Sequence, residues 1–193
     1  MSSREKILDA IRAAKPAGGG PVAYDVTPTH TGDVIAQFES SVVTNGGRFF
    51  RVSGLEETKT LIAREYASAY QIISTVTGID GSRELRAEDD PHTLADVDLA
   101  VVQGEVGVAE NAAIWLSESR LVKRVLPFIA QNLAILIREG DIVATLHEAY
   151  ARISVAREGY GVFISAPSKT ADIEQSLVIG AHGPRSLSVI LTP

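Results

Sequence analysis

The run Leu133-Ala134-Ile135-Leu136-Ile137 is continuously apolar and is the stretch that decides the fold class. Two similar runs precede it, at Leu99–Val102 and at Ala113–Leu116. Short apolar runs without polar interruption are typical of strands that are covered on both faces, as in parallel sheets. The sequence therefore predicts that these three runs are buried strands.

Helical patterns alternate with strand patterns on both sides of these runs. Helices are predicted at residues 31–43, 53–66, 141–153 and 170–179, and further strands at residues 48–52, 70–76, 162–164 and 187–191. Such alternation predicts an α/β domain, with a largely parallel sheet and helices on both of its faces. In sheets of this kind the ligand site lies beyond the carboxyl ends of the strands.

The N-terminus is predicted to form a separate helical arm. A capping box, Ser2-x-x-Glu5, opens a helix, and the GGGP stretch at residues 18–21 breaks the chain after it. We therefore divide the chain into an arm with its linker (residues 1–21) and a single α/β domain (residues 22–193). A second capping box, Ser53-x-x-Glu56, is predicted to open the helix at residues 53–66, with Leu55 facing inward.

Composition excludes several classes of function. The 193 residues include no cysteine, so the chain can hold no iron–sulfur cluster through thiolates and can form no disulfide. The spacing of the four histidines does not suit a metal site. A net charge of −6 argues against nucleic acid or a membrane as the main partner. Without a signal-peptide core or an apolar run of transmembrane length, we expect a cytoplasmic protein.

The stretch SAPSKTADIEQSLVIGAHGP, residues 165–184, carries the densest polar chemistry. Ser168 would lie at the start of the predicted helix at residues 170–179, where free N–H groups and the helix dipole favour an anion. The functional interpretation is a phosphate or carboxylate pocket, and the alternative is helix capping alone. The predicted ligand-binding residues of this stretch and its flank are Ser165, Ser168, Lys169, Thr170, Asp172 and Arg185.

Two further groups are candidate acids or bases. His182 lies between glycines that allow a close approach to a ligand, although a glycine there could simply end a helix. Glu110 and Asn111 precede the buried run at residues 113–116, and a carboxylate there can act as base or nucleophile if burial raises its pKa. Alternatively, these two side chains only satisfy loop backbone or contact water. We predict Glu110 and His182 as catalytic candidates and Asn111 as a ligand contact.

Taken together, residues 165–174 and 180–184 resemble a motif of the LUD (lactate utilisation) domain family, S-G-P-S-[RK]-T-A-D-I-E followed by G-x-H-G-P. Within that family the resemblance is to the lactate utilisation protein C group. Val108-Ala109-Glu110 resembles the family's I-A-E, and Leu126-Pro127 its L-P. Two features depart from the pattern. Asn111-Ala112-Ala113 stands where many members have Thr-Gly-Thr or Thr-Gly-Ser, and a histidine that is common after the L-P segment is replaced near Gln131-Asn132.

The resemblance implies a fold similar to the sugar-phosphate isomerase and CoA-transferase superfamily. It also implies a role in oxidising L-lactate to pyruvate, with the iron–sulfur clusters held by partner oxidoreductase subunits and no cofactor held by this chain. The chain would then be a non-redox subunit that binds a small anionic metabolite, such as lactate or pyruvate, a phosphosugar or a CoA ester. Two alternatives remain open: a stand-alone isomerase or acyl-CoA transferase with Glu110 as base or nucleophile, and a scaffold subunit without a ligand.

Overall fold

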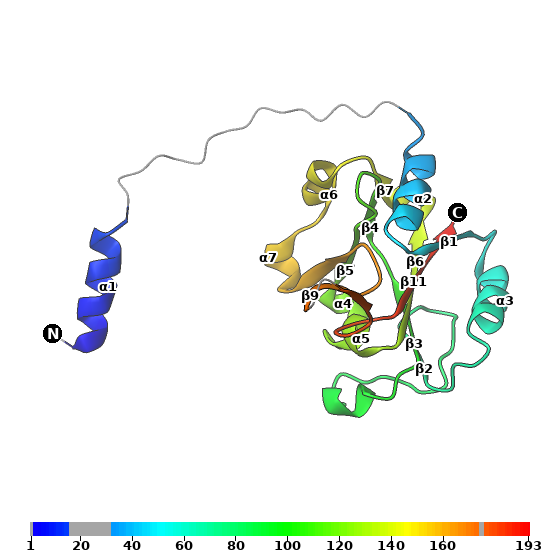
Figure 1. Ribbon diagram of the computed structural model, residues 1–193, viewed down its shortest axis with the longest axis horizontal. Helices are drawn as coiled ribbons and strands as arrows, with labels where there is room; N and C mark the ends of the chain where they lie inside the picture. The colour runs from blue at the N-terminus through cyan, green and yellow to red at the C-terminus, as the bar shows by residue number, and fades with distance from the viewer. Residues whose placement is uncertain (1, 16–31, 174–175) are drawn as a thin grey trace.

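The run at residues 133–137 is the middle strand of a five-stranded sheet in which every pairing is parallel (Figure 1). This computed structural model describes residues 2–15, 32–173 and 176–193, without the side chains of residues 171–177. The strands, in spatial order, are β1 (Arg48–Arg51), β11 (Ser186–Thr192), β6 (Asn132–Arg138), β3 (Leu99–Gln103) and β2 (Ile72–Ser74). The predicted parallel sheet is confirmed.

Successive side chains of the central strand are buried on opposite faces of this sheet. Leu133, Ile135 and Ile137 pack on one face, whereas Ala134 and Leu136 pack on the other. Helix α3 (Leu55–Glu65) covers the second face, and α2 (Val34–Thr44), α4 (Glu118–Leu121) and α5 (Leu126–Ile129) pack on the first. Burial on both faces is the reason that β6 reads as a continuous apolar run.

A second, mixed sheet lies across the core from the first. Its strands, in spatial order, are β7 (Ile142–Val143), β4 (Val106–Val108), β5 (Ile114–Ser117) and β8 (Gly161–Ile164). Only the β4–β7 pairing is parallel. The side chains of Ile114 and Leu116 join the core under the central sheet, while Trp115 packs on the outer face with α6 (Leu146–Arg152). The runs at residues 113–116 and 162–164 are thus strands, but of this second sheet.

The predicted helix at residues 141–153 is wrong in its first half. A short 3-10 turn, η2 (Glu139–Asp141), is followed by strand β7, and α6 begins only at Leu146. Ile142 and Val143 are β-branched and pair with β4, which explains the preference for a strand. A further turn of helix, α7 (Val155–Glu158), leads into β8, and a 3-10 turn, η1 (Pro91–Leu94), precedes β3.

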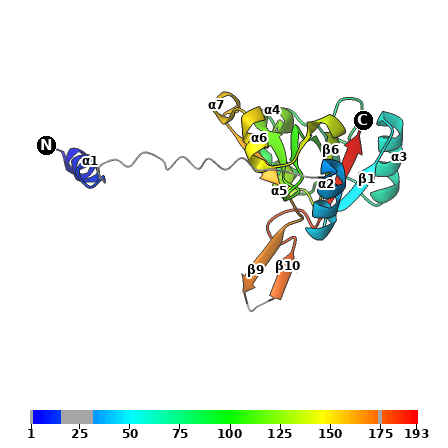
Figure 2. The ribbon, with the colours of Figure 1, turned by 90° about the horizontal axis from the view of Figure 1, so that it is seen from above.

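The predicted helix at residues 170–179 is also wrong. These residues form an antiparallel hairpin of β9 (Lys169–Ile173) and β10 (Ser176–Ile179), which projects from the body of the molecule (Figure 2). Thr170 pairs with Val178, and such β-branched residues favour strands over helices. Ser168 therefore precedes a strand, and no helix start lies there to favour an anion.

The first predicted capping box is confirmed, and the second is wrong. In α1 (Ser3–Ala13), the Glu5 N–H donates to Ser2 Oγ and the Ser2 N–H donates to Glu5 Oε2. Before α3, the Ser53 N–H and hydroxyl both donate to Glu57 instead of pairing with Glu56, and Leu55 is exposed.

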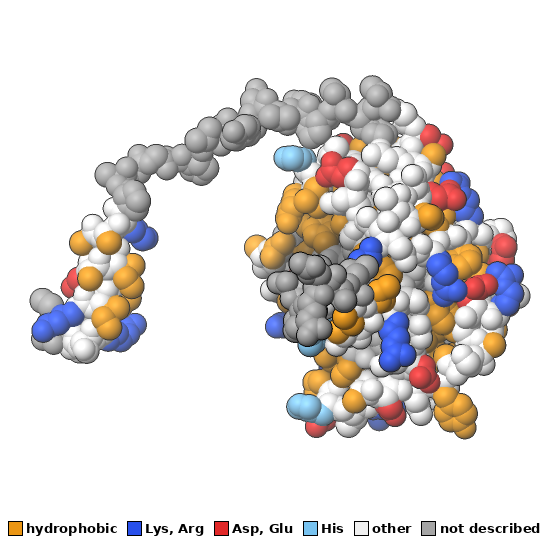
Figure 3. Space-filling model, viewed as in Figure 1, with side chains coloured by type: hydrophobic (Ala, Val, Ile, Leu, Met, Phe, Trp, Pro, Cys, Tyr) orange, Lys and Arg blue, Asp and Glu red, His pale blue; other side chains and the backbone are white. Residues whose placement is uncertain are grey.

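Hydrophobic side chains lie along one side of α1, and none of its residues is buried (Figure 3). The GGGP stretch lies outside the described residues, so the division into residues 1–21 and 22–193 stays a prediction. Among the helices in the described ranges, none is both long and apolar enough to cross a bilayer.

Candidate functional site

A cleft of about 750 Å³ opens at the carboxyl ends of the parallel strands. Every strand of the central sheet contributes a lining residue at or just after its end: Ser53 (β1), Thr75 (β2), Gln103 (β3), Arg138 (β6) and Thr192 (β11). This is the place where open α/β sheets bind their ligands. Its volume is within the usual range for small-molecule sites.

Two arginines in the cleft each hold a carboxylate through Nε alone. Arg120 Nε donates to Glu105 Oε1 at 3.2 Å, and Arg138 Nε donates to Asp141 Oδ2 at 2.7 Å. Among the described residues, neither arginine donates a hydrogen bond from its terminal nitrogens. A guanidinium fork can bind a carboxylate or phosphate through two parallel hydrogen bonds. The cleft therefore presents two groups that can bind an anion.

The carboxylate of Glu105 lies in the wall of the cleft, just after β3. Its Oε1 also accepts a 2.7 Å hydrogen bond from the hydroxyl of Ser117, which is fully buried in β5. Gly104 allows this approach of the chain to the second sheet, since a Cβ at that position would lie 2.5 Å from the side chain of Ile114. The glycine and the buried serine together fix where Glu105 lies.

Helix α3 begins at the cleft without a side-chain cap on its first N–H groups. The hydrogen bonds that Ser53 donates from its backbone and hydroxyl hold the pKa of the Glu57 carboxyl below its usual range. Across the cleft, Thr75 Oγ1 is buried and has no hydrogen-bond partner among the described residues. The start of α3 adds a positive end of a helix dipole to the cleft.

Three of the predicted ligand residues come together, but around the end of α2 and not in the cleft. Ser165 Oγ donates to the Asn111 carbonyl at 2.5 Å, and Asn45 Nδ2 donates to both groups at 3.0 Å. Lys169 Nζ donates to the Asn45 carbonyl at 2.6 Å. Asn45 is the C-cap of α2, so the ammonium group lies at the negative end of a helix dipole. In this cluster Lys169 caps a helix.

Lys169→Met is expected to lower the free energy of unfolding by about 1 kcal/mol, because it removes a charged donor from the last turn of α2. Urea denaturation measures the change. Lys59→Met is the matched control: its exposed ion pair with Glu56 on α3 is worth only about 0.3 kcal/mol. A loss for Lys169→Met no larger than that of the control would contradict the capping role.

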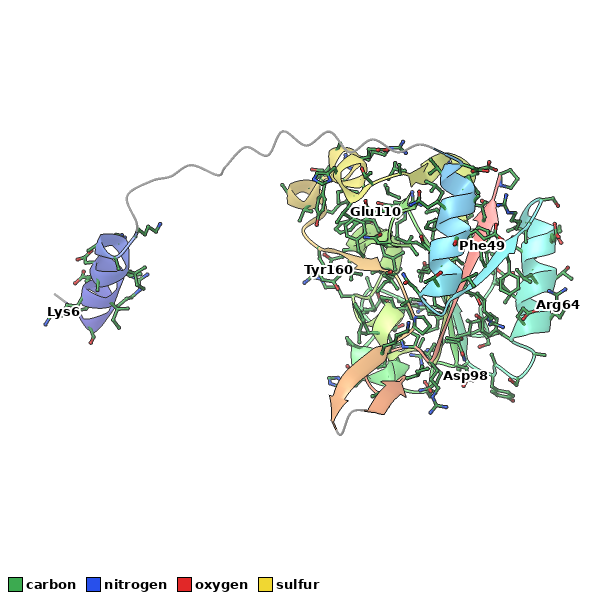
Figure 4. The ribbon with its side chains drawn as sticks, turned by 45° about the horizontal axis from the view of Figure 1, so that its top comes forward. Lys6, Phe49, Arg64, Asp98, Glu110 and Tyr160 are labelled. Carbon is green, nitrogen blue, oxygen red and sulfur yellow. The ribbon has the colours of Figure 1, made fainter. Side chains whose placement is uncertain are left out.

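Glu110 and His182 are not joined by a hydrogen bond, and neither lines the cleft. Glu110 Oε1 accepts from the Leu146 N–H at 2.8 Å and so caps the start of α6, beside which it is labelled in Figure 4. His182 is exposed in the loop between β10 and β11. Asn111 Oδ1 accepts from the Ala113 N–H. For Glu110 and Asn111 these contacts match the alternative interpretation, in which they satisfy loop backbone.

The other predicted site residues lie at the base of the hairpin. The Ser168 N–H donates to the Pro184 carbonyl, and the Ser168 carbonyl accepts from the Gly180 N–H. Thr170 lies in β9. Arg185 packs against Gly180, where a Cβ would overlap the arginine side chain. The side chain of Asp172 lies outside the described part. Within the described ranges, no three His, Asp or Glu side chains are grouped so as to hold a metal ion.

Sequence reasoning missed the charged residues of the cleft, namely Glu105, Arg120, Arg138 and Asp141. Arg138 did carry a signal, because it directly follows the apolar run at residues 133–137, and Glu105 stands three residues after the run at residues 99–102. The rule that ligands bind beyond the carboxyl ends of parallel strands applies to these two residues. We applied it instead to the polar stretch after residue 164, which follows a strand of the other sheet.

A family model described as the LUD domain matches residues 80–192, more than half of the chain. The chain belongs to the LUD domain family. Its LUD domain includes Glu105, Arg120, Arg138 and Asp141 of the cleft, whereas Ser53 and Thr75 precede the matched residues.

The chain is also similar to curated proteins and to a solved structure. Lactate utilization protein C of Deinococcus radiodurans is 29% identical over 94% of this chain and 90% of that protein. Lactate utilization protein C of Bacillus pumilus is 33% identical, over 44% of this chain and 38% of that protein. The crystal structure of a DUF162 family protein from Deinococcus radiodurans aligns with a TM-score of 0.65 and 26% identity, over 83% of this chain and 96% of that one.

Proposed function

We propose that this LUD-domain protein is a component of L-lactate utilisation and binds a small organic anion in the cleft at the strand ends. The relatives named lactate utilization protein C support the role, the first of them over nearly the whole chain. The binding site is inferred from two arginines in the cleft, Arg120 and Arg138. The terminal guanidinium nitrogens of both donate no hydrogen bond within the described residues and are available to a ligand.

The chain acts in this proposal as a non-redox subunit. Oxidation of lactate to pyruvate removes two electrons and two protons, and an acceptor must take the electrons. A chain without cysteine cannot bind an iron–sulfur cluster through thiolates. We therefore assign the electron transfer to partner iron–sulfur oxidoreductase subunits, and we propose that this chain holds no redox cofactor of its own.

The cleft is a better candidate for the anion than the start of β9. Lys169, the cation of the predicted pocket, already donates to the end of α2, and no helix begins at Ser168. The cleft, in contrast, combines two guanidinium groups with the start of α3. With about 750 Å³ it can take lactate or pyruvate and also larger anions, such as a phosphosugar or part of a CoA ester.

A thermal-shift panel tests the proposal with L-lactate, pyruvate, phosphosugars and CoA thioesters. A ligand at one hundred times its Kd should raise Tm by about 5–10 °C in a protein of this size. The double variant Arg120→Gln/Arg138→Gln should lose the shift. Arg86→Gln is the matched control, because its guanidinium pairs with Glu84 and does not line the cleft.

Two outcomes would contradict the proposal. If no anion of the panel shifts the wild-type protein, the cleft is not an anion site, and a scaffold subunit without a ligand becomes the better account. If the shift persists in the double variant, the anion binds elsewhere. The stand-alone enzyme with Glu110 as base is not proposed, since that carboxylate caps α6 and does not line the cleft.

A further inference from the structure

The two oxygens of the Glu105 carboxylate have different surroundings. Oε1 accepts both the Ser117 hydroxyl and Arg120 Nε, at 2.7 and 3.2 Å. Oε2 accepts no hydrogen bond from any described residue. The side chain is 28% exposed, and the residue lines the cleft. One oxygen is thus fixed by the protein, and the other has no partner among the described residues and is available to a ligand.

The same arginine that fixes Glu105 is one of the two anion-binding groups. Arg120 uses Nε for the glutamate, so a ligand carboxylate on its terminal nitrogens would lie close to Glu105. A group on the carbon next to that carboxylate would then meet Oε2. A hydroxyl can donate a proton to it, whereas a keto oxygen is an acceptor only and would face another acceptor.

We propose that Glu105 makes the cleft selective for 2-hydroxy acids over 2-keto acids, an inference that rests on the proposed function. Arg120 and Arg138 bind the carboxylate of the acid, and Glu105 Oε2 accepts the hydrogen bond of its 2-hydroxyl. A keto acid leaves Oε2 desolvated and without a donor. Discrimination by a polar group that the bound ligand covers and leaves unpaired is stronger than discrimination by size in an apolar pocket.

Ser117 acts in this proposal as a positioning residue. It is fully buried in β5, and its hydroxyl donates to Glu105 Oε1 and lies 3.0 Å from the hydroxyl of Ser119. Ser119 in turn donates to Glu158 on α7. This chain of hydrogen bonds holds the carboxylate in one orientation. Without the Ser117 hydroxyl, Glu105 would remain in the cleft but would be less fixed.

Isothermal titration calorimetry with L-lactate, pyruvate and propionate tests the inference. Propionate has the carboxylate but neither the hydroxyl nor the keto group. The wild type should bind L-lactate about tenfold more tightly than pyruvate, the value of one hydrogen bond to a charged group. In Glu105→Gln this ratio should fall to about one, because the amide can donate to a keto oxygen. Ser117→Ala should give an intermediate ratio and leave propionate binding unchanged.

The matched control is Glu118→Gln, which removes the same charge from neighbouring helix α4, where Glu118 pairs with Arg124 outside the cleft. It should keep the wild-type ratio. A ratio of two Kd values in one variant is insensitive to a modest loss of folded protein, so a general destabilisation cannot imitate the effect.

The outcomes separate this inference from the proposed function. Equal binding of L-lactate and pyruvate by the wild type, or a ratio that survives Glu105→Gln, overturns the role of Glu105 and leaves the anion site intact. Binding that persists in Arg120→Gln/Arg138→Gln overturns the proposed site itself. If none of the three acids binds the wild type, the role of Glu105 is overturned, and the anion site then stands or falls with the phosphosugars and CoA thioesters of the thermal-shift panel.

Discussion

Phe38→Ala is expected to lower the free energy of unfolding by about 3–5 kcal/mol, the usual cost of deleting a buried phenylalanine ring. Phe38 lies on α2 and is fully buried. Its ring meets the edge of Phe49 of β1, with the centroids 6.0 Å apart, and a Cβ on Gly107 of β4 would lie 3.2 Å from it. One side chain thus joins α2 to both sheets, and its removal leaves a cavity between them.

Urea denaturation of the wild type and of Phe38→Ala measures this loss of unfolding free energy. Phe128→Ala is the matched control, because Phe128 on α5 is 37% exposed and should cost clearly less. A loss below about 1 kcal/mol for Phe38→Ala would mean that α2 does not pack between the sheets as described. Equal losses for the two variants would lead to the same conclusion.

Gly161→Ala is expected to cost about 1–3 kcal/mol, the usual penalty for overpacking. Gly161 lies in β8, and the indole ring of Trp115 on the neighbouring strand β5 packs directly over it. A Cβ there would overlap the ring, so the tryptophan has to leave its place against Phe163. Since Trp115 is the only tryptophan in the sequence, its fluorescence should also report the displacement.

Gly140→Ala serves as the control for this substitution. A Cβ on Gly140 would meet nothing within 4 Å, so that variant should unfold at nearly the wild-type urea concentration and keep its emission spectrum. If Gly161→Ala behaves like Gly140→Ala, Trp115 does not cover β8, and the outer face of the second sheet must be packed differently.

The central sheet could be predicted from the sequence because its strands are buried on both faces. A run such as residues 133–137 contains no polar residue, so its strand pattern is recognised easily. In the structure its side chains pack into two hydrophobic cores, one on each face of the sheet. The assignment of strands to sheets could not be predicted in this way. Ile114 and Leu116 look like central-sheet residues, yet they belong to a sheet whose pairing depends on residues far along the chain.

The hairpin was missed because local signals conflict at residues 169–179. Acidic residues after Ser168 look like the first turn of a helix, whereas Thr170, Val178 and Ile179 favour a strand. The pairing of β9 with β10, together with the backbone bonds that close the base of the hairpin, outweighs the helix signal.

The candidate site was predictable in position but not in its residues. The rule about carboxyl ends of parallel strands holds, but applying it requires knowing which strands are parallel. Residues 162–164 end in the mixed sheet, so the polar stretch after them lies near the end of α2. Arg120 and Glu105 meet in space because the chain crosses at Gly104 from the side of β6 to β5, where the Glu105 N–H donates to the Trp115 carbonyl. Such contacts are set by topology, which no local pattern encodes.

The most direct test of the binding site is a ¹H–¹⁵N correlation spectrum of the full chain, recorded with and without L-lactate. The account predicts chemical-shift changes at the amides around the cleft, such as those of Gly54, Thr75 and Glu105. The cluster at the end of α2, represented by Asn45 and Lys169, should be unaffected. Changes confined to Asn45, Lys169 and the base of the hairpin would contradict the account and place the anion where the polar motif begins.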